Sequence, residues 1–153
     1  MSGPRTSRSR PSRFDVWPTP IAAQDLRALR GDVRKAARRV RAELERSGCR
    51  AAKYRLSGNG LERICVITLP HAYRMLVAFP NAREVAVLMV GPHSPINPEA
   101  DVYRRLYTAL GVEVPTAARR KPACCDGEAP PVDEELVERF LERSRELLRR
   151  RRS

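Results

Sequence analysis

The sequence predicts an α+β protein: a small antiparallel sheet packed against an N-terminal helical hairpin, with an additional helix at the C-terminus. Apolar residues recur every three or four positions between residues 20 and 47, and again between 132 and 152, as on one face of an amphipathic helix. Between residues 63 and 90, three runs rich in β-branched residues are separated by short turn-forming segments, which is typical of strands joined as hairpins. A chain of 153 residues has room for one such domain and its tails.

The chain opens with a segment that we do not expect to pack. Residues 1–13 are polar, contain proline and lack periodicity, so they predict a disordered basic arm. Phe14 to Trp17 then form a short strand-like run. Thr19 followed by Pro20 predicts a helix start, because threonine caps helices and proline suits the first helical position.

The following helical stretch is divided in two. Its apolar stripe continues across Gly31-Asp32, where we expect a break, with Asp32 capping the second helix. Gly48 is a suitable stop for that helix. The stripe consists of Leu26, Leu29, Val33, Ala37, Val40 and Leu44.

The middle of the chain predicts the sheet. Tyr54–Leu56 is a possible short strand, and longer strands are expected at Arg63–Leu69, Tyr73–Phe79 and Glu84–Val90. Their connections have hairpin length, so the strands should form an antiparallel meander. Because the strands lack a clearly polar face, we expect at least the central ones to be covered on both sides.

The last third contains two more helices. The first is expected to begin at Pro98 or Glu99 and to end at Gly111. These boundaries place the main domain at residues 14–115, a linker at 116–131 and an amphipathic helix at 132–153. That final helix is expected to dock on its own domain, or alternatively to cover a partner groove or form a dimer contact.

The charge of the chain favours a polyanion as partner. The formal net charge is +12, and residues 1–115 hold 20 Lys and Arg against 10 Asp and Glu. Such a field accelerates encounter with phosphate backbones, and binding of this kind weakens with salt. Twenty-seven of the thirty basic residues are arginine, which a GC-rich genome would also produce, so composition bias is an alternative source of the charge.

Several classes of protein are not indicated. No apolar stretch reaches membrane-spanning length and no secretory signal is recognisable, so a cytoplasmic location is expected. The four cysteines contain no Cys-x-x-Cys pair and have two histidines as possible companions, which does not favour a metal site. We expect reduced thiols.

The order of several short motifs resembles the RelE/ParE superfamily of toxins from type II toxin-antitoxin systems, over about residues 14–110. The motifs are Trp17-Pro18-Thr19-Pro20, Lys53-Tyr54-Arg55-Leu56-Ser57-Gly58, Tyr73-Arg74, Val90-Gly91-Pro92-His93 and Asp101-Val102-Tyr103-Arg104. The resemblance implies a small βααβββ domain. In the RelE branch, it implies a metal-independent endoribonuclease that cuts mRNA on the ribosome, with no cofactor and with an antitoxin as protein partner.

The resemblance also implies site residues. Arg74 matches the family's catalytic arginine, whose forked cation suits a phosphate that gains charge in the transition state. His93 falls where relatives carry arginine or histidine, and an imidazole can transfer protons near neutral pH. Tyr103 matches a late tyrosine that could stack on a base or transfer a proton. Lys53, Arg55, Arg63, Arg34, Lys35 and Arg38 are candidate RNA contacts.

One departure leaves alternatives open. The strand before Tyr73-Arg74 lacks the lysines that help to activate the nucleophile in the RelE branch, and an arginine such as Arg63 is too basic to replace them as a neutral base. Either His93 carries more of the chemistry or ribonuclease activity has been lost. The alternatives are a catalytically inactive nucleic-acid- or protein-binding module and a gyrase inhibitor of the ParE type.

Overall fold

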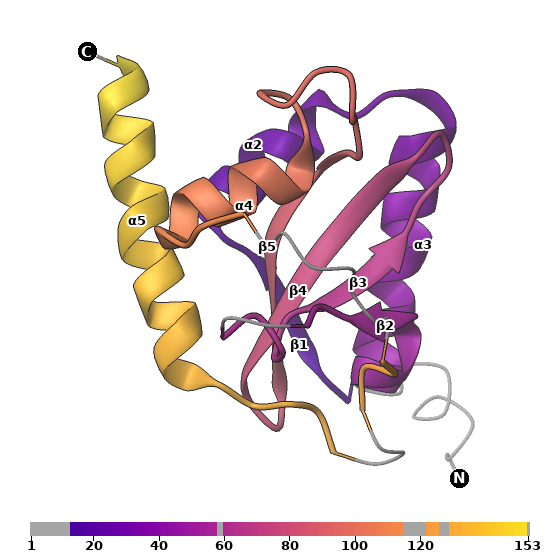
Figure 1. Cartoon of the computed structure of the whole chain (residues 1–153). Helices are drawn as coiled ribbons and strands as arrows, with labels where there is room; N and C mark the ends of the chain where they lie inside the picture. The colour runs from indigo at the N-terminus through magenta and orange to yellow at the C-terminus, as the bar shows by residue number, and fades with distance from the viewer. Residues whose placement is uncertain (1–12, 58–59, 115–121, 126–128, 153) are drawn as a thin grey trace, which may run out of the picture.

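The chain folds as an α+β protein whose helices lie on both faces of a five-stranded mixed sheet (Figure 1). The computed structural model describes residues 13–57, 60–114, 122–125 and 129–152. The elements in chain order are β1 (Asp15–Pro18), α2 (Pro20–Ala28), α3 (Gly31–Ser47), the 3-10 helix η1 (Gly48–Ala51), β2 (Tyr54–Arg55), β3 (Cys65–Thr68), β4 (Tyr73–Asn81), β5 (Glu84–Pro92), α4 (Val102–Leu110) and α5 (Glu134–Arg152). The expected basic arm lies almost wholly outside the described residues, as does much of the expected linker.

The sheet order is β1-β5-β4-β3-β2, and the predicted antiparallel meander of β3, β4 and β5 is confirmed. The expectation of a wholly antiparallel sheet is wrong, because β1 pairs with β5 in parallel. Hairpins fix the neighbours of consecutive strands, whereas β1 reaches the outer edge of β5 only after the chain has folded back. There the indole N–H of Trp17 donates to Glu84 Oε1 at 2.7 Å.

Both faces of the sheet are covered, as the apolar strands predict. One face packs against α3 through residues such as Val33, Ala37 and Leu44. The opposite face packs against α4 and α5, with Leu106 and Phe140 fully buried. Within the described part of the chain, no helix is long and apolar enough to cross a bilayer.

Local capping explains where the N-terminal helices begin and end. Thr19 is the N-cap of α2, as expected: its hydroxyl accepts from the N–H of Ala22 at 3.1 Å and donates to the carbonyl of Leu88 at 2.8 Å. The expectation that Asp32 caps the second helix is wrong. The helix begins after Arg30, whose side chain makes no cap hydrogen bond. Asp32 instead lies in the first turn, where its charge favours the helix dipole.

The helix expected to begin at Pro98 or Glu99 begins three or four residues later. Asp101 is the N-cap of α4 and accepts a hydrogen bond from the N–H of Arg104 at 3.0 Å. This aspartate satisfies a first-turn donor of the helix that begins at Val102. The predicted end is confirmed, because Gly111 adopts a left-handed conformation as the C-cap.

The C-terminal helix α5 docks on its own domain (Figure 1). Leu136, Val137 and Phe140 are buried against the face that α4 also covers. Ser144 is fully buried, and its hydroxyl accepts a hydrogen bond from the N–H of Ile21 at 3.1 Å. Because that N–H belongs to the first turn of α2, α5 supplies a cap that α2 cannot make by itself.

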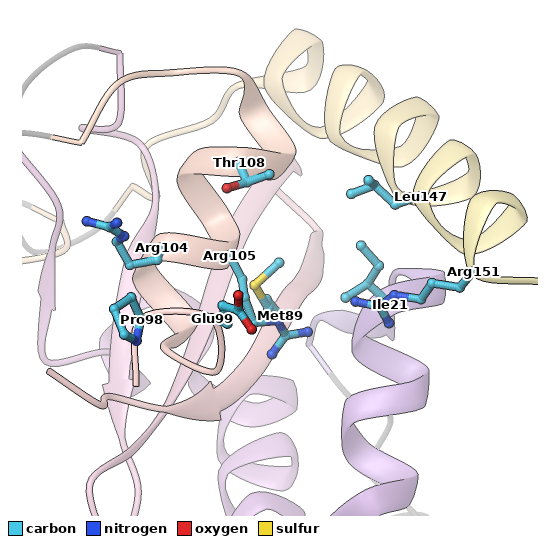
Figure 2. Close-up of a pocket in the computed structure, with 9 residues that line it drawn as sticks. All are labelled: Ile21, Met89, Pro98, Glu99, Arg104, Arg105, Thr108, Leu147 and Arg151. Carbon is cyan, nitrogen blue, oxygen red and sulfur yellow. The ribbon is translucent and has the colours of Figure 1, made fainter. Parts of the chain in front are cut away.

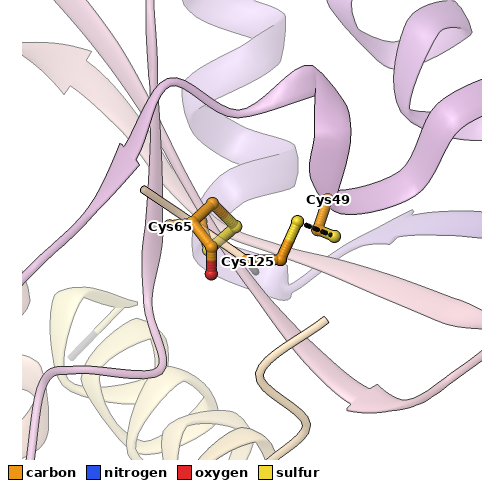
Figure 3. The surroundings of a disulfide bond; sticks show 4 residues. Cys49, Cys65 and Cys125 are labelled. Atoms are coloured by element: carbon orange, nitrogen blue, oxygen red, sulfur yellow. Dashed lines mark hydrogen bonds between the residues drawn. A yellow bond between two sulfur atoms is a disulfide. The ribbon is translucent and has the colours of Figure 1, made fainter. Parts of the chain in front are cut away.

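The cysteines contradict the expectation of four reduced thiols. Cys65 on β3 and Cys124 form a disulfide, while Cys49 and Cys125 are free thiols (Figure 3). The Sγ atoms of the two free cysteines lie 2.7 Å apart. Sequence spacing gave no warning because the bonded cysteines are 59 residues apart. Burial, assisted by contact with Cys125, raises the pKa of Cys49 to about 12.

This arrangement predicts a specific pattern of thiol labelling. In the folded protein at pH 8, iodoacetamide should leave Cys49 unmodified, because only the thiolate reacts and Cys49 keeps its proton. In denaturant without reductant, two cysteines should be labelled, and after reduction all four should be, as read by intact mass. Four labels without reductant would contradict the disulfide.

Candidate functional site

The start of β4 and the end of β5 bring together the sequence-predicted site residues. Antiparallel pairing sets Arg74 opposite Gly91 and Tyr73 opposite Pro92. His93 follows directly, and its N–H donates to the carbonyl of Ala72 at 2.8 Å. The N-terminal half of α4 lies over this corner and supplies Asp101 and Tyr103.

His93 is oriented by a buried carboxylate. Its Nδ1 lies 2.8 Å from Oδ1 of Asp101, which also accepts from the N–H of Ser94 at 2.7 Å. The Asp101 side chain is 6% exposed, whereas that of His93 is 44% exposed. The carboxylate therefore holds Nδ1 of a partly exposed imidazole, and Nε2 is the ring nitrogen left to exchange a proton with a bound molecule.

Tyr103 connects the histidine to the sheet. Its ring meets that of His93 edge-on, with centroids 5.1 Å apart and an interplanar angle of 80°. Its hydroxyl lies 3.3 Å from that of Tyr54 on β2. Burial raises the pKa of Tyr103 well above its usual value and Tyr54 adds to the rise, whereas the charge of Arg74 opposes it. The phenol therefore stays protonated at neutral pH, and a residue only 8% exposed offers little ring surface to a stacked base.

Arg74 lies half-buried beside these groups. Its Nη1 donates to the carbonyl of Tyr73 at 2.8 Å, which restrains the guanidinium. Its Nε is buried and has no hydrogen-bond partner among the described residues. An unsatisfied buried donor is unfavourable by about 1–3 kcal/mol.

The turn beneath His93 is strained. His71 and Ala72, between β3 and β4, both have positive φ, 59° and 61°, and are the only non-glycine residues among those described to do so. Two consecutive positive φ angles favour Asn-Gly rather than His-Ala. Since the carbonyl of Ala72 anchors the backbone of His93, the strained turn helps to position the site.

The candidate RNA contacts do not all gather at this corner. Lys53 and Arg55 lie near the β2 edge, and Arg63 Nη1 donates to the carbonyl of Val132 at 2.9 Å. Arg34, Lys35 and Arg38 are exposed on α3, which covers the opposite face of the sheet from α4. The predicted binding residues therefore form separate surfaces.

The α3 surface contains a hollow of about 230 Å³ next to α2. Its floor is apolar and includes Leu26, Met75 and Val87. The other lining residues include four arginines and no carboxylate: Arg27, Arg34, Arg38 and Arg41. Arg34 and Arg38 of the sequence prediction thus belong to a shared basic surface, whereas Lys35 is not among its lining residues.

Two site residues were missed by the sequence interpretation. Asp101 was quoted in a motif but given no role, although an aspartate just before a helix is a recognisable cap. Its second oxygen is what holds His93, and that contact depends on the path of the intervening loop. Tyr54 was likewise quoted only as part of a segment, and no local signal indicates that its hydroxyl meets Tyr103 across 49 residues.

The cluster thus combines a restrained cation, an imidazole held by a carboxylate and two adjacent phenols. These groups can bind an anionic centre and move a proton beside it. Among the described residues, no three His, Cys, Asp or Glu side chains are arranged to hold a metal ion. The chain matches no known family model, and searches of curated proteins and of solved structures also find no match.

Relief of strain in the turn should stabilise the protein. Replacing His71→Asn and Ala72→Gly together should raise the free energy of unfolding by about 1–2 kcal/mol, because asparagine and glycine tolerate the left-handed region. Urea denaturation measures the change.

Ala82→Gly is the matched control for this substitution. It places the alanine-to-glycine part of the change in the β4–β5 turn, where φ is not positive. There the added freedom of the unfolded chain should be the main effect and should destabilise by about 0.4–1 kcal/mol. Equal destabilisation at both turns would contradict strain at Ala72.

Proposed function

We propose that the protein is a toxin-like endoribonuclease related to the RelE branch, which cleaves ribosome-bound mRNA through the 2′-hydroxyl of the RNA. The observation that carries the proposal is that Arg74 lies in the same corner of the sheet as the His93–Asp101 pair. Arg74 comes from β4, His93 from the end of β5 and Asp101 from the cap of α4. The net charge of +12 favours an RNA substrate.

The proposed reaction needs a base, a charge acceptor and a route for the leaving group. The 2′-oxygen attacks phosphorus, the bond from phosphorus to the 5′-oxygen breaks, and a 2′,3′-cyclic phosphate and a 5′-hydroxyl result. Nε2 of His93 receives the 2′ proton, and water protonates the 5′-oxygen. Asp101 stabilises the imidazolium that forms, in the manner of a base-orienting carboxylate.

Arg74 and the phenols would act on the phosphate. The forked cation of Arg74 suits the non-bridging oxygens, whose charge increases in the transition state. Tyr103 remains protonated, so it contributes as a hydrogen-bond donor and not as a base. This division of roles assigns the base to His93, which accounts for the absence of lysines from β3.

An antitoxin and the ribosome are the proposed partners, on the strength of the family resemblance.

A second candidate function is that of a binding module without catalysis. The observation that favours it is the hollow beside α3, where four arginines and no carboxylate line an apolar floor on the face opposite the His93 cluster. Nucleic acid bound in this hollow would not contact His93, so it would be bound without being cleaved.

Cleavage assays separate these functions. The full-length protein, incubated with ribosomes and an mRNA in a buffer that contains Mg²⁺, should yield fragments ending in cyclic phosphate. Arg74→Ala and His93→Ala should each lower the rate by about 10²-fold or more, because each removes a group that acts in the transition state.

A matched control addresses charge. Arg83→Ala removes an equal charge from an exposed turn and should cleave at the wild-type rate. A wild-type protein that binds RNA without cutting it would favour the binding module, and loss of that binding in Arg38→Ala would assign it to the α3 surface.

Asp101→Asn tests the positioning role of the carboxylate. Asparagine can keep the helix cap, but it cannot stabilise a protonated His93 by charge. We expect kcat to fall by about 10²-fold with KM unchanged, since the substrate does not contact Asp101. If the variant also unfolded at the assay temperature, the loss of activity would indicate a structural role for Asp101 instead.

A further inference from the structure

A second basic pocket, lined by none of the residues of the His93 cluster, lies between α4 and α5 (Figure 2). Its volume is about 340 Å³, within the range of small-molecule sites. Arg104, Arg105 and Thr108 come from α4, and Leu147 and Arg151 from α5. The remaining lining residues are Ile21, Met89, Pro98 and Glu99.

Arg105 is fixed in place before any ligand arrives. Its Nη2 donates to both oxygens of Asp25, at 2.9 and 3.2 Å, and Asp25 accepts from the N–H of Val90 at 3.0 Å. The guanidinium passes so close to Gly91 that a Cβ there would lie 2.9 Å from Nη1. The pair thus joins α2, β5 and α4, and holds a cation at the pocket wall.

Arg151 approaches from the other side. Its Nη1 donates to Oε1 of Gln24 on α2 at 3.2 Å, so α5 delivers this guanidinium to the pocket. Figure 2 shows Leu147 and Arg151 facing the α4 residues across the pocket. Burial raises the pKa of Asp25, and the charges of Arg105 and, more weakly, Arg151 oppose that rise, so both cations act on the same region.

The charge and the apolar surface together define a ligand class. Arg104, Arg105 and Arg151 carry three positive charges, and Asp25 and Glu99 carry two negative charges. The difference is one net positive charge, which can attract an anionic group. Leu147 and Pro98 offer apolar surface to the body of the ligand, whereas Ile21 and Met89, 2% and 1% exposed, close the inner end of the pocket. The Thr108 hydroxyl can donate to a phosphate oxygen, and Glu99 can accept from a hydroxyl or amine.

We infer that this pocket binds a small phosphate monoester with an apolar or flat body, such as a nucleoside monophosphate. Guanidinium groups suit phosphate because their paired donors match its oxygens. The inference does not depend on the ribonuclease proposal, since none of the pocket residues belongs to the His93 cluster.

Calorimetric titration of the full-length protein in 150 mM salt tests the inference, with adenosine 5′-monophosphate, adenosine and inorganic phosphate as probes. The monophosphate should bind at least tenfold more tightly than either of the other two. Arg151→Ala and Thr108→Val should each weaken its binding, Arg151→Ala by about tenfold or more, the loss of one charged contact.

Arg145→Ala is the matched control, because it removes an arginine of α5 that does not line the pocket. It should leave the affinity unchanged, which separates the pocket from the general positive charge. Glu99→Gln should tighten the binding of inorganic phosphate by removing a like charge.

Three outcomes would overturn the inference. The first is no binding of the monophosphate at about 10 mM, which excludes even a millimolar Kd. The second is an equal loss of affinity in Arg145→Ala and Arg151→Ala, and the third is adenosine binding as tightly as its monophosphate. Circular dichroism of each variant establishes that it is folded. The result is independent of RNA cleavage, so either proposal can fail alone.

Discussion

The antiparallel pairing of β4 with β5 is the constraint on which the other parts of the structure depend. Every residue from Val85 to Gly91 is buried, so both faces of β5 must be covered by helices. A slip of one residue would exchange the sets that face α3 and α5, which fixes the register. The same register sets Arg74 opposite Gly91 and delivers His93 to the corner of the sheet.

Buried polar groups then attach the helices to this sheet. Thr19 joins the start of α2 to β5, Ser144 joins α5 to α2, and Asp101 joins α4 to the end of β5. Each of the three side chains is buried and each makes a hydrogen bond, as a buried polar group requires. The contact of Asp101 is the one with functional consequence, because it couples a helix cap to the orientation of an imidazole.

The two basic pockets lie on opposite faces of the sheet, and they arise in different ways. The hollow beside α3 has a rim of arginines spaced along helices, a pattern that the sequence already displays. The pocket between α4 and α5 depends on Asp25 holding Arg105 across 80 residues and on α5 returning to α2. Charge composition could indicate a polyanion partner, but it could not locate this second site.

The sequence by itself determined most of the secondary structure and the meander of β3–β5, because periodicity and turns are properties of neighbouring residues. The choice of Arg74, His93 and Tyr103 came from the resemblance of short motifs to a toxin family and stays a prediction. Sequence patterns misplaced the starts of α3 and α4 by a few residues, where competing caps lie close together. Only the tertiary structure decided the parallel β1, the Cys65–Cys124 disulfide and the contacts of Asp101 and Tyr54. Each of these joins groups that the backbone brings together from different elements, and no local pattern encodes such distances.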